Sequence, residues 1–273
     1  MPRVSVIVAT HNNEETIERC LGSIAAQTYS PLEIVVVDNF STDATCQLAQ
    51  RFATQVVRAG DERCAQFNIG VAASAGEYVL RVDADFVLEP TVVSECVAEC
   101  MNGADAIAVH NSPDADVGWI ARIRKFEVDM YRGDLLHSSA RFLRRDAYLA
   151  VGGLDQALIA GEDYDLQSRL DRSGYVTRFI EAEALHLGEP RSLVAHLGKY
   201  FRYGAQFVVY WRKSPSDARR KLGLTGRPYF SHWRSFVERP GMGAAFVLYT
   251  LLKFSAGGLG FAYGLACSWL RRG

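Results

Sequence analysis

Residues 76–90 read GEYVLRVDADFVLEP, an apolar run that ends in two acidic residues, Asp83 and Asp85. Alternate residues of a β-strand share a face, so the two carboxylates would lie about 6.6 Å apart along the strand. At an effective dielectric near 20 they would repel by about 2.5 kcal/mol. A divalent cation such as Mg²⁺ or Mn²⁺ turns this repulsion into attraction. The stretch therefore predicts a metal site at a strand end; the alternative is a solvated loop whose acids cap the next helix.

The composition indicates a globular protein. The chain has 273 residues, 49% hydrophobic and 22% charged, enough for one large α/β domain with an appendage. Its six cysteines form no C-x-x-C pair, which favours reduced thiols over a zinc site. The apolar run at residues 4–9 is too short for a signal-peptide core. We therefore expect the protein to stay on the cytoplasmic side, where it is made.

Charge is divided unevenly along the chain. Residues 1–190 hold 16 Lys and Arg against 29 Asp and Glu, whereas residues 191–273 hold 14 against 2. This division predicts an acidic body over residues 1–190 and a basic tail over residues 191–273 that meets an anionic partner.

The tail combines positive charge with aromatic rings and an apolar end. Arginines and lysines at 212–213, 219–221, 227, 234 and 239 alternate with aromatic residues, and a Gly-rich apolar stretch follows at 241–270. Such a surface could bind single-stranded nucleic acid. The apolar stretch favours a membrane surface instead, where each Lys or Arg gains about 1 kcal/mol from anionic lipid.

The uncharged segment from Phe254 to Leu270 has 17 residues. As a helix it would measure about 25 Å, less than the roughly 30 Å of a hydrocarbon core. Lys253, if near a helix end, could extend its ammonium to the headgroups. We therefore favour a peripheral or monotopic anchor over a transmembrane span. A buried soluble helix or a dimer interface is the alternative.

The periodicity of residues 1–190 alternates between strand and helix. Strands are expected at 3–9, 33–38, 55–58, 78–82 and 176–180, and helices at about 42–52, 65–75, from Pro90 and at 119–127. Asn12 with Glu15 resembles a helix N-cap. The alternation predicts a doubly wound, mostly parallel sheet with helices on both faces.

Polar residues stand at three expected strand ends, namely Thr10, Asp38 and Asp83. Ligands of open parallel sheets bind beyond the carboxyl ends of the strands. The three residues therefore indicate one nucleotide-sized crevice, although each could instead cap the helix that follows it.

Three stretches resemble glycosyltransferase family 2 with its GT-A fold. They are VSVIVATHNNEETIERCLGSIAAQTYSPLEIVVVDNFSTDAT at 4–45, FNIGVAASAGEYVLRVDAD at 67–85 and GGLDQALIAGEDYDLQSRL at 152–170. The resemblance covers roughly residues 3–188 in the family's order. It implies a donor half at about 1–110 and an acceptor half at about 111–190.

The resemblance also implies roles for individual residues on the donor side. Thr10, Asn12 and Asp38 would hold the base and ribose of a nucleotide-sugar, and Arg63 and Asn68 would line the donor side. Asp83 would contact the ribose or a metal-bound water, and Asp85 would ligate the Mg²⁺ or Mn²⁺ that bridges the diphosphate.

On the acceptor side, Glu162 and Asp163 resemble the acidic motif of the family, with Asp163 as the catalytic base. His186 could complete the metal or diphosphate site; the alternative is a packing histidine. A positioned carboxylate that deprotonates a hydroxyl contributes about 10²–10⁴-fold. Direct displacement by that hydroxyl inverts the anomeric centre.

The sequence departs from the usual pattern at three places. Asn39-Phe40 replaces Asp-Gly or Asn-Gly, and Arg81 replaces an apolar residue. No Gln-x-x-Arg-Trp element follows, which argues against a processive synthase.

Together these features predict an inverting, metal-dependent, non-processive transferase. It would move a sugar from a nucleotide-sugar, with UDP expected, to a hydroxyl of a lipid-linked or membrane-associated glycan. A polyprenyl phosphate acceptor is the alternative, since an ionised phosphate would need no base. A nucleotidyltransferase would normally carry a Gly-rich basic loop where this chain has Thr-His-Asn-Asn. An inactive membrane adaptor would not need the acidic residues, and no nucleic-acid partner is expected.

Overall fold

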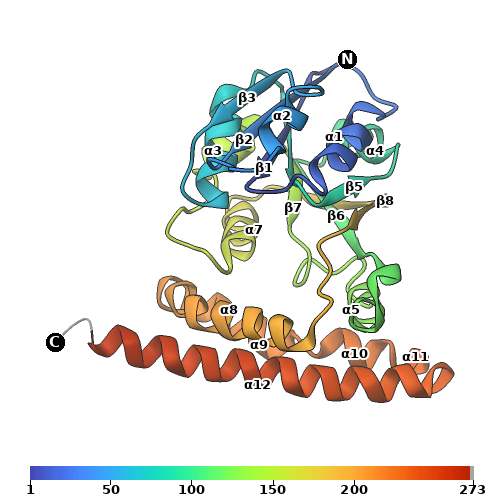
Figure 1. Cartoon of the computed structure of the whole chain (residues 1–273), viewed down its shortest axis with the longest axis vertical. Coiled ribbons are helices and arrows are strands. Elements are labelled where there is room, and N and C mark those ends of the chain that lie inside the picture. Colours follow the sequence, from blue (N-terminus) through green and yellow to red (C-terminus); the bar gives the residue numbers. More distant parts are fainter. Residues whose placement is uncertain (271–273) are drawn as a thin grey trace. The chain divides into compact units, whose positions relative to one another are not determined.

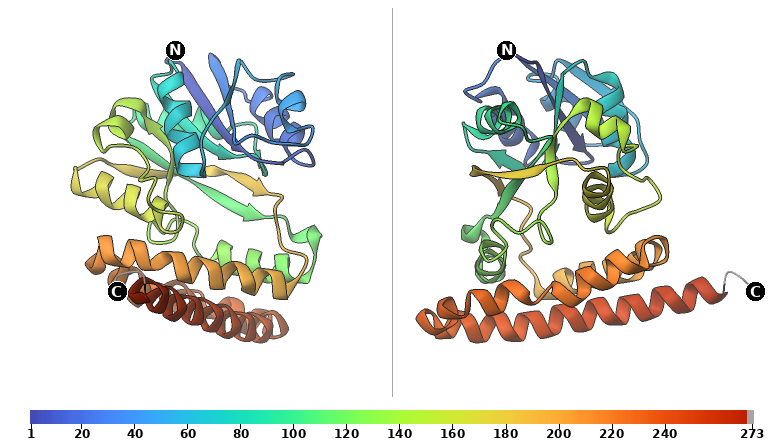
Figure 2. Two further views of the ribbon diagram at one scale, coloured as in Figure 1. Left: turned by 60° about the vertical axis from the view of Figure 1, so that its left-hand side comes forward. Right: turned by 180° about the vertical axis from the view of Figure 1, so that it is seen from behind.

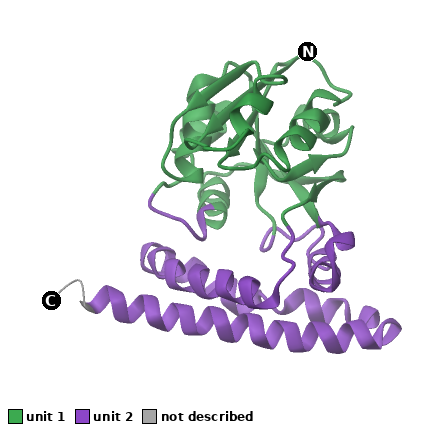
Figure 3. Ribbon diagram, viewed as in Figure 1, with its two compact units in different colours: residues 1–112, 138–156, 163–188 green, residues 113–137, 157–162, 189–273 purple. Residues whose placement is uncertain are grey.

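The computed structural model describes residues 1–270, which divide into two compact units (Figure 3). Unit 1 contains residues 1–112, 138–156 and 163–188. Unit 2 contains residues 113–137, 157–162 and the chain from residue 189 onward.

Unit 1 is built on an eight-stranded mixed sheet with the order β3-β2-β1-β4-β7-β6-β8-β5. Its first half comprises β1 (Val4–Thr10), α1 (Ile17–Ala25), β2 (Leu32–Asp38), α2 (Thr45–Ala49), β3 (Gln55–Arg58), α3 (Arg63–Ala73) and β4 (Tyr78–Asp83). The four strands of this half are parallel. The predicted alternation of strand and helix is therefore correct here.

The second half of the sheet contains antiparallel strand pairs. It comprises β5 (Phe86–Leu88), α4 (Val92–Met101), β6 (Ala106–Pro113), β7 (Ala140–Arg144), α6 (Arg145–Ala150), α7 (Glu162–Arg172) and β8 (Thr177–His186). Strand β7 pairs with both β4 and β6, and β8 pairs with β5. The β5–β8 pair places Phe86 opposite His186.

Strand β1 shows why the sheet is covered on both faces. All seven of its residues are buried. Val4, Val6 and Val8 face a core that includes α1 and α4, whereas Ile7 and Ala9 face a second core that includes α3, α6 and α7. Figures 1 and 2 show α1 and α4 on one face of the sheet and α3 and α7 on the other. A nearly continuous apolar run is typical of a central parallel strand.

The predicted N-cap at Asn12 is wrong. Helix α1 begins at Ile17, with Thr16 at its N-cap position. Asn12 instead has a positive φ of 51°, and its Oδ1 accepts a hydrogen bond from the Thr42 amide at 2.9 Å. The Asn12 side chain thus binds the loop after β2 and does not cap α1.

Unit 2 is helical. It comprises a short 3₁₀ turn (Ala115–Val117), α5 (Trp119–Asp129), α8 (Leu193–Lys213), α9 (Pro215–Leu224), α10 (Arg227–Ser231), α11 (Trp233–Glu238) and α12 (Pro240–Leu270). Helix α12 runs along α8 (Figure 1). Glycines permit this close approach, since a Cβ at Gly260 would lie 1.9 Å from the Phe201 carbonyl oxygen and one at Gly204 would lie 2.0 Å from that of Gly257.

Helix α12 has 31 residues, so the apolar segment is longer than the 17 residues counted from Phe254. It is the one helix among the described residues that is long and apolar enough to cross a membrane, judged by length and composition. The condition under which Lys253 could extend its ammonium to the headgroups, a position near a helix end, is not met. Lys253 lies near the middle of α12, is 5% exposed, and bonds Glu127 of α5.

Candidate active site

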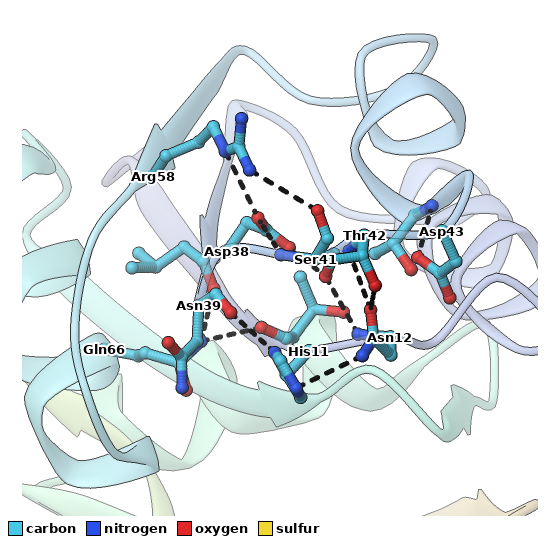
Figure 4. A network of polar contacts seen from close by, with 12 residues as sticks. His11, Asn12, Asp38, Asn39, Ser41, Thr42, Asp43, Arg58 and Gln66 are labelled. Atoms are coloured by element: carbon cyan, nitrogen blue, oxygen red, sulfur yellow. Dashed lines mark hydrogen bonds and ion pairs between the residues drawn. The ribbon is translucent and has the colours of Figure 1, made fainter.

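The loops after β1 and β2 form one polar network (Figure 4). Thr10 and Asp38 stand at the ends of these strands, as the sequence predicted, and they are register partners. Asp38 is fully buried and accepts hydrogen bonds from the Ser41 amide, at 2.9 Å, and from the Ser41 hydroxyl. The Arg58 Nε atom lies 3.7 Å from the Asp38 carboxylate. The network therefore fixes an anionic group at the strand edge and leaves Arg58 half exposed beside it.

Gln66 of α3 joins the two strand ends. Its Nε2 donates to the Thr10 carbonyl at 2.9 Å and to the Val37 carbonyl at 2.7 Å, and the residue is 4% exposed. Val37 lies within both ladders of β2, and the Thr10 carbonyl also accepts a hydrogen bond from the Asn39 amide at 2.9 Å, so Gln66 adds a bond from α3 to each of the two strands. Gln66 was not among the predicted site residues.

Phe40 has a positive φ of 50°, a conformation that favours glycine. It occupies the place where the resemblance expects Gly, and the residue is 55% exposed. The Arg58 guanidinium lies 5.7 Å from the ring centroid. The loop therefore keeps the tight turn and adds an exposed aromatic face beside the strand edge.

Asp83, at the end of β4, is held between two arginines. Arg141 Nη1 lies 3.1 Å from Asp83 Oδ2, and Arg63 Nη1 lies 3.5 Å from Asp83 Oδ1. Burial raises the pKa of Asp83, but the Arg63 and Arg141 charges outweigh it and lower the pKa below its usual value. Asp83 is thus an ionised carboxylate that is already neutralised by neighbouring charges.

Asp85 and His186 converge on one point. The His186 Nε2 and Asp85 Oδ2 atoms are 3.2 Å apart, and the His186 ring packs on Phe86 at 4.7 Å. Gly188 leaves room for the carboxylate, since a Cβ there would lie 2.3 Å from Asp85 Oδ2. Among residues 1–270 no group of three or more His, Cys, Asp and Glu side chains is arranged to hold a metal ion. The Asp85 carboxylate is the kind of oxygen ligand that suits Mg²⁺ or Mn²⁺, and the His186 imidazole would be a second donor beside it.

Asp163, near the start of α7, is bonded to Arg81 of β4. Arg81 Nη2 donates to Asp163 Oδ1 at 3.0 Å and to the Ala140 carbonyl at 2.7 Å. Burial raises the pKa of Asp163, but the charges of Arg81, Arg63 and Arg141 outweigh it and lower this pKa to about 2. The structure thus brings Asp163 and Asp83 under the influence of the same arginines.

The remaining predicted residues have other surroundings. Glu162 is the first residue of α7 and is 5% exposed. The Asn68 side chain donates to the Leu154 carbonyl at 2.8 Å and accepts from the Leu154 amide at 3.0 Å and from the Tyr148 hydroxyl at 2.6 Å. Its bonds order the glycine turn ahead of α7, and a contact with the donor stays a prediction.

Sequence reasoning did not assign site positions to Arg58, Gln66, Arg81 and Arg141. Arg81 had one signal, a charged residue inside an otherwise apolar strand. Because a buried charge needs a partner, this position already pointed to an acidic residue elsewhere in the chain. The other three gave no such signal. Each contacts a residue at least 20 positions away in the chain, and no sequence pattern links the two positions.

Residues 5–150 match the family model described as glycosyl transferase family 2, and residues 78–270 match that of glycosyl transferase family group 2. The chain belongs to glycosyl transferase family 2. The predicted family and the assignment as a glycosyltransferase are therefore confirmed.

Relatives of this family 2 chain include two proteins of Haloferax volcanii. Glycosyltransferase AglE is 26% identical over 241 residues, which cover 82% of this chain and 79% of AglE. A glucosyl-dolichyl phosphate glucuronosyltransferase is 29% identical over 182 residues, 56% of either chain. An uncharacterized glycosyltransferase of Nostoc is 32% identical, but the match covers 41% of this chain and 37% of that protein.

Solved structures share the fold at low sequence identity. The mannosyltransferase PcManGT of Pyrobaculum calidifontis, solved with GDP-Man and Mn²⁺, has a TM-score of 0.65 at 19% identity and covers 98% of this family 2 chain and 87% of its own. Staphylococcus aureus TarS 1–349 with UDP-GlcNAc has a TM-score of 0.54 at 19% identity, over 76% and 66% of the two chains. The predicted GT-A fold is confirmed.

Proposed function

We propose that this family 2 enzyme is an inverting, metal-dependent, non-processive glycosyltransferase. It transfers a sugar from a nucleotide-sugar, with UDP expected, to a hydroxyl of a lipid-linked or membrane-associated glycan. The observation that carries the proposal is the position of Asp163, which Arg81 ties to the strand that ends in the Asp83–Asp85 pair. One carboxylate for the acceptor thus lies within the electrostatic reach of the carboxylates for the donor.

The donor would lie along the carboxyl edge of β1, β2 and β4. Thr10, Asn12 and Asp38 would contact the base and ribose, and Phe40 offers an exposed aromatic face on which a base can stack. Arg63 and Arg141 would attract the diphosphate, while Asp83 keeps both guanidinium groups in place. The solved structures of relatives in this fold include complexes with GDP-Man and with UDP-GlcNAc.

Asp85 and His186 would hold the metal ion next to the diphosphate. A bound divalent cation would stabilise the negative charge of the departing diphosphate. Asp163 would accept the proton of the acceptor hydroxyl, with Glu162 beside it in the chain. Attack by that hydroxyl on the face opposite the diphosphate inverts the anomeric centre.

A polyprenyl phosphate acceptor is favoured by one observation. The ion pair with Arg81 keeps the pKa of Asp163 at about 2, which weakens this carboxylate as a base. An ionised phosphate would need no base. The name of the Haloferax glucuronosyltransferase describes action on glucosyl-dolichyl phosphate, a lipid-linked sugar, and supports the hydroxyl acceptor.

The tail would place the enzyme at the cytoplasmic surface of a membrane. Helix α12 exposes an uncharged row that includes Leu248, Leu251, Leu259, Tyr263 and Trp269. The buried Lys253–Glu127 pair removes the charge that would oppose insertion of this face. An amphipathic surface of this kind with surrounding arginines suits the interfacial plane of anionic lipid.

A ligand-dependent unfolding panel tests the donor site. UDP, GDP, CMP and dTDP and their sugars are added with and without Mn²⁺, because a ligand at one hundred times its Kd stabilises by about 2.7 kcal/mol. We expect a metal-dependent rise of the melting temperature with one nucleotide, UDP. A rise that is the same without metal would contradict metal dependence, and no rise with any nucleotide would reject the donor site.

The base assignment is tested with Asp163→Asn and the control Asp171→Asn, an exposed residue of the same helix. With a lipid-linked saccharide as acceptor, Asp163→Asn should lower kcat at least one hundredfold and leave nucleotide binding unchanged. Asp171→Asn should retain kcat within twofold. If Asp163→Asn keeps its turnover with a polyprenyl phosphate and the wild type also prefers that acceptor, the alternative acceptor is correct.

A further inference from the structure

An apolar groove lies within unit 2, between α10, α11 and α12. Its volume is about 340 Å³. This is within the range of about 300–1,000 Å³ that is usual for small-molecule sites. Phe230, Trp233, Phe236, Phe246, Val247 and Leu251 are among its lining residues. The groove is far along the chain from every residue placed in the donor and acceptor sites, and the proposed chemistry does not use it.

Few polar atoms line the groove; one of them is the buried Thr250 Oγ1, which has no hydrogen-bond partner among the described residues. Tyr229 lines the groove, but its hydroxyl is bonded to Glu127, at 2.7 Å, and to Tyr131. The rings of Phe236 and Phe246 pack edge-to-face at 5.5 Å and form the inner wall. A ligand in the groove would therefore meet carbon on almost every side, which suits a hydrocarbon and not a sugar.

The outer wall of the groove is exposed. Phe230 is 81% and Leu251 is 62% exposed, although both are large apolar residues. Leu251 also belongs to the uncharged outward row of α12, and Val247, one turn before it, is 50% exposed, so the groove is continuous with that row. Exposed apolar surface of this kind marks an interaction site.

Arginines lie on and beside the helices that form the groove, and their positive charge favours an anionic apolar ligand over a neutral one. The Arg234 guanidinium lies 5.9 Å from the centroid of the Trp233 ring. Exposed arginines also begin α10, at Arg227, and follow α11, at Arg239. Glu238 is the one acidic residue of α10 and α11. An apolar chain that ends in a phosphate complements both the carbon wall and the arginines.

We propose that this groove binds the hydrocarbon chain of the lipid that carries the acceptor, and that Arg234 and its neighbouring arginines contact the lipid phosphate. The assignment of this lipid to the acceptor rests on the proposed function; the binding of a phosphorylated hydrocarbon does not. The groove would hold the first part of the chain, and the rest would continue along the outward row of α12.

The test uses the full chain and monomeric farnesyl phosphate, without vesicles or detergent. Leu251→Asp is compared with Leu259→Asp, because both are exposed leucines of α12 and only Leu251 lines the groove. Leu251→Asp should weaken farnesyl phosphate binding at least tenfold, and Leu259→Asp less than twofold. Arg234→Gln should weaken binding of farnesyl phosphate and leave that of farnesol unchanged.

Photolabelling of the wild type gives a second measurement that no folding defect can obscure. A diazirine derivative of farnesyl phosphate should label residues 229–251. Labelling elsewhere, equal losses in the two leucine variants, or binding of anionic vesicles without binding of monomeric farnesyl phosphate would overturn the proposal. In the last case the groove is part of a membrane-facing surface.

The melting temperature with UDP and Mn²⁺ is measured on the same samples. If farnesyl phosphate binds as expected while no nucleotide stabilises the protein, the groove proposal is supported and the proposed transferase function is rejected. If UDP and Mn²⁺ stabilise the protein while farnesyl phosphate binding does not depend on Leu251, the donor site stands and the groove proposal fails.

Discussion

Arg81 and Asp163 form an ion pair in which Arg81 Nη2 lies 3.0 Å from Asp163 Oδ1, although the residues are 82 positions apart. Arg81 is 3% exposed, and its guanidinium carbon lies 5.5 Å from the centroid of the Phe67 ring. The second bond of Arg81, to the Ala140 carbonyl, fixes the guanidinium on the sheet. The carboxylate that we propose as the base is thus held by a charge in the strand that ends at Asp83.

Replacement of Arg81 by Met should shift the acid limb of the activity profile. In the wild type, Asp163 protonates only near pH 2, so this group causes no loss of activity at higher pH. Without the Arg81 charge its pKa rises, and the protonated fraction grows at a higher pH. We also expect a roughly tenfold to one hundredfold lower kcat at neutral pH, because the carboxylate is less well positioned. The measurement is kcat/KM against pH, which reports groups of the free enzyme.

Arg144→Met is the control for this variant. Arg144 lies at the end of β7, the strand that pairs with β4, and it forms an ion pair with the exposed Asp146. Its profile should coincide with that of the wild type. An acid limb in Arg81→Met that also coincides with the wild type would show that Asp163 is not the titrating base.

The sequence predicted the parts of the fold that depend on local pattern. Strands β1, β2, β3 and β4 fall within two residues of their expected positions. The antiparallel half was not predicted, because the periodicity of a strand does not reveal its partner or direction. Asp83, Asp85 and Asp163 stand in motifs that can be recognised in the sequence. Arg141, which pairs with Asp83 from β7, was missed because the sequence pattern does not show which strands are neighbours. Lys253 could not be placed from sequence, since its partner Glu127 is 126 residues away.

Asp85 and His186 should together determine metal dependence. Asp85→Ala removes the oxygen of the pair and should abolish the extra stabilisation that Mn²⁺ gives to the UDP complex, about 2.7 kcal/mol at one hundred times the Kd. His186→Ala should reduce it in part. Both variants should bind UDP without metal as the wild type does, since the arginines and the loops after β1 and β2 are unchanged. The measurement is the melting temperature with UDP as a function of Mn²⁺ concentration.

Asp171→Ala, on the exposed face of α7, is the matched control and should respond to Mn²⁺ as the wild type does. A full Mn²⁺ response in Asp85→Ala would exclude this residue as a ligand and direct attention to Asp83.

The buried Glu127–Lys253 pair should dominate the stability of unit 2. Lys253→Met leaves the Glu127 carboxylate buried and should lower the free energy of unfolding by about 3–5 kcal/mol. The double variant Glu127→Gln with Lys253→Met should recover most of this loss. Lys125→Met, which breaks an exposed pair with Asp129 on the same α5, should cost less than about 1 kcal/mol. The measurement is denaturant unfolding at neutral pH.

The same pair predicts a dependence on acid. Burial raises the pKa of Glu127, but the Lys253 charge and the hydrogen bonds from Lys253, Tyr229 and Tyr131 outweigh it and lower the pKa. Because the folded-state pKa is below that of the unfolded chain, the stabilisation is complete above the usual Glu range and is lost as the pH falls through the folded-state pKa. The wild type should therefore lose stability in acid more steeply than the double variant. Equal slopes would contradict an ionised pair.

Two glycines of α12 separate helix packing from helix propensity. A Cβ at Gly260 would lie 1.9 Å from the Phe201 carbonyl oxygen of α8, whereas one at Gly258 would meet nothing within 4 Å. Gly260→Val should force α12 away from α8 and lower the free energy of unfolding by about 1–3 kcal/mol or more. Gly258→Val places the same side chain two residues earlier, and it should be neutral or slightly stabilising because Val is the better helix former. Denaturant unfolding of the two variants measures the difference. Equal stabilities would mean that α8 and α12 do not approach as closely as the glycines allow. The face of α12 that packs on α8 would then be undefined, and so would the opposite, outward face.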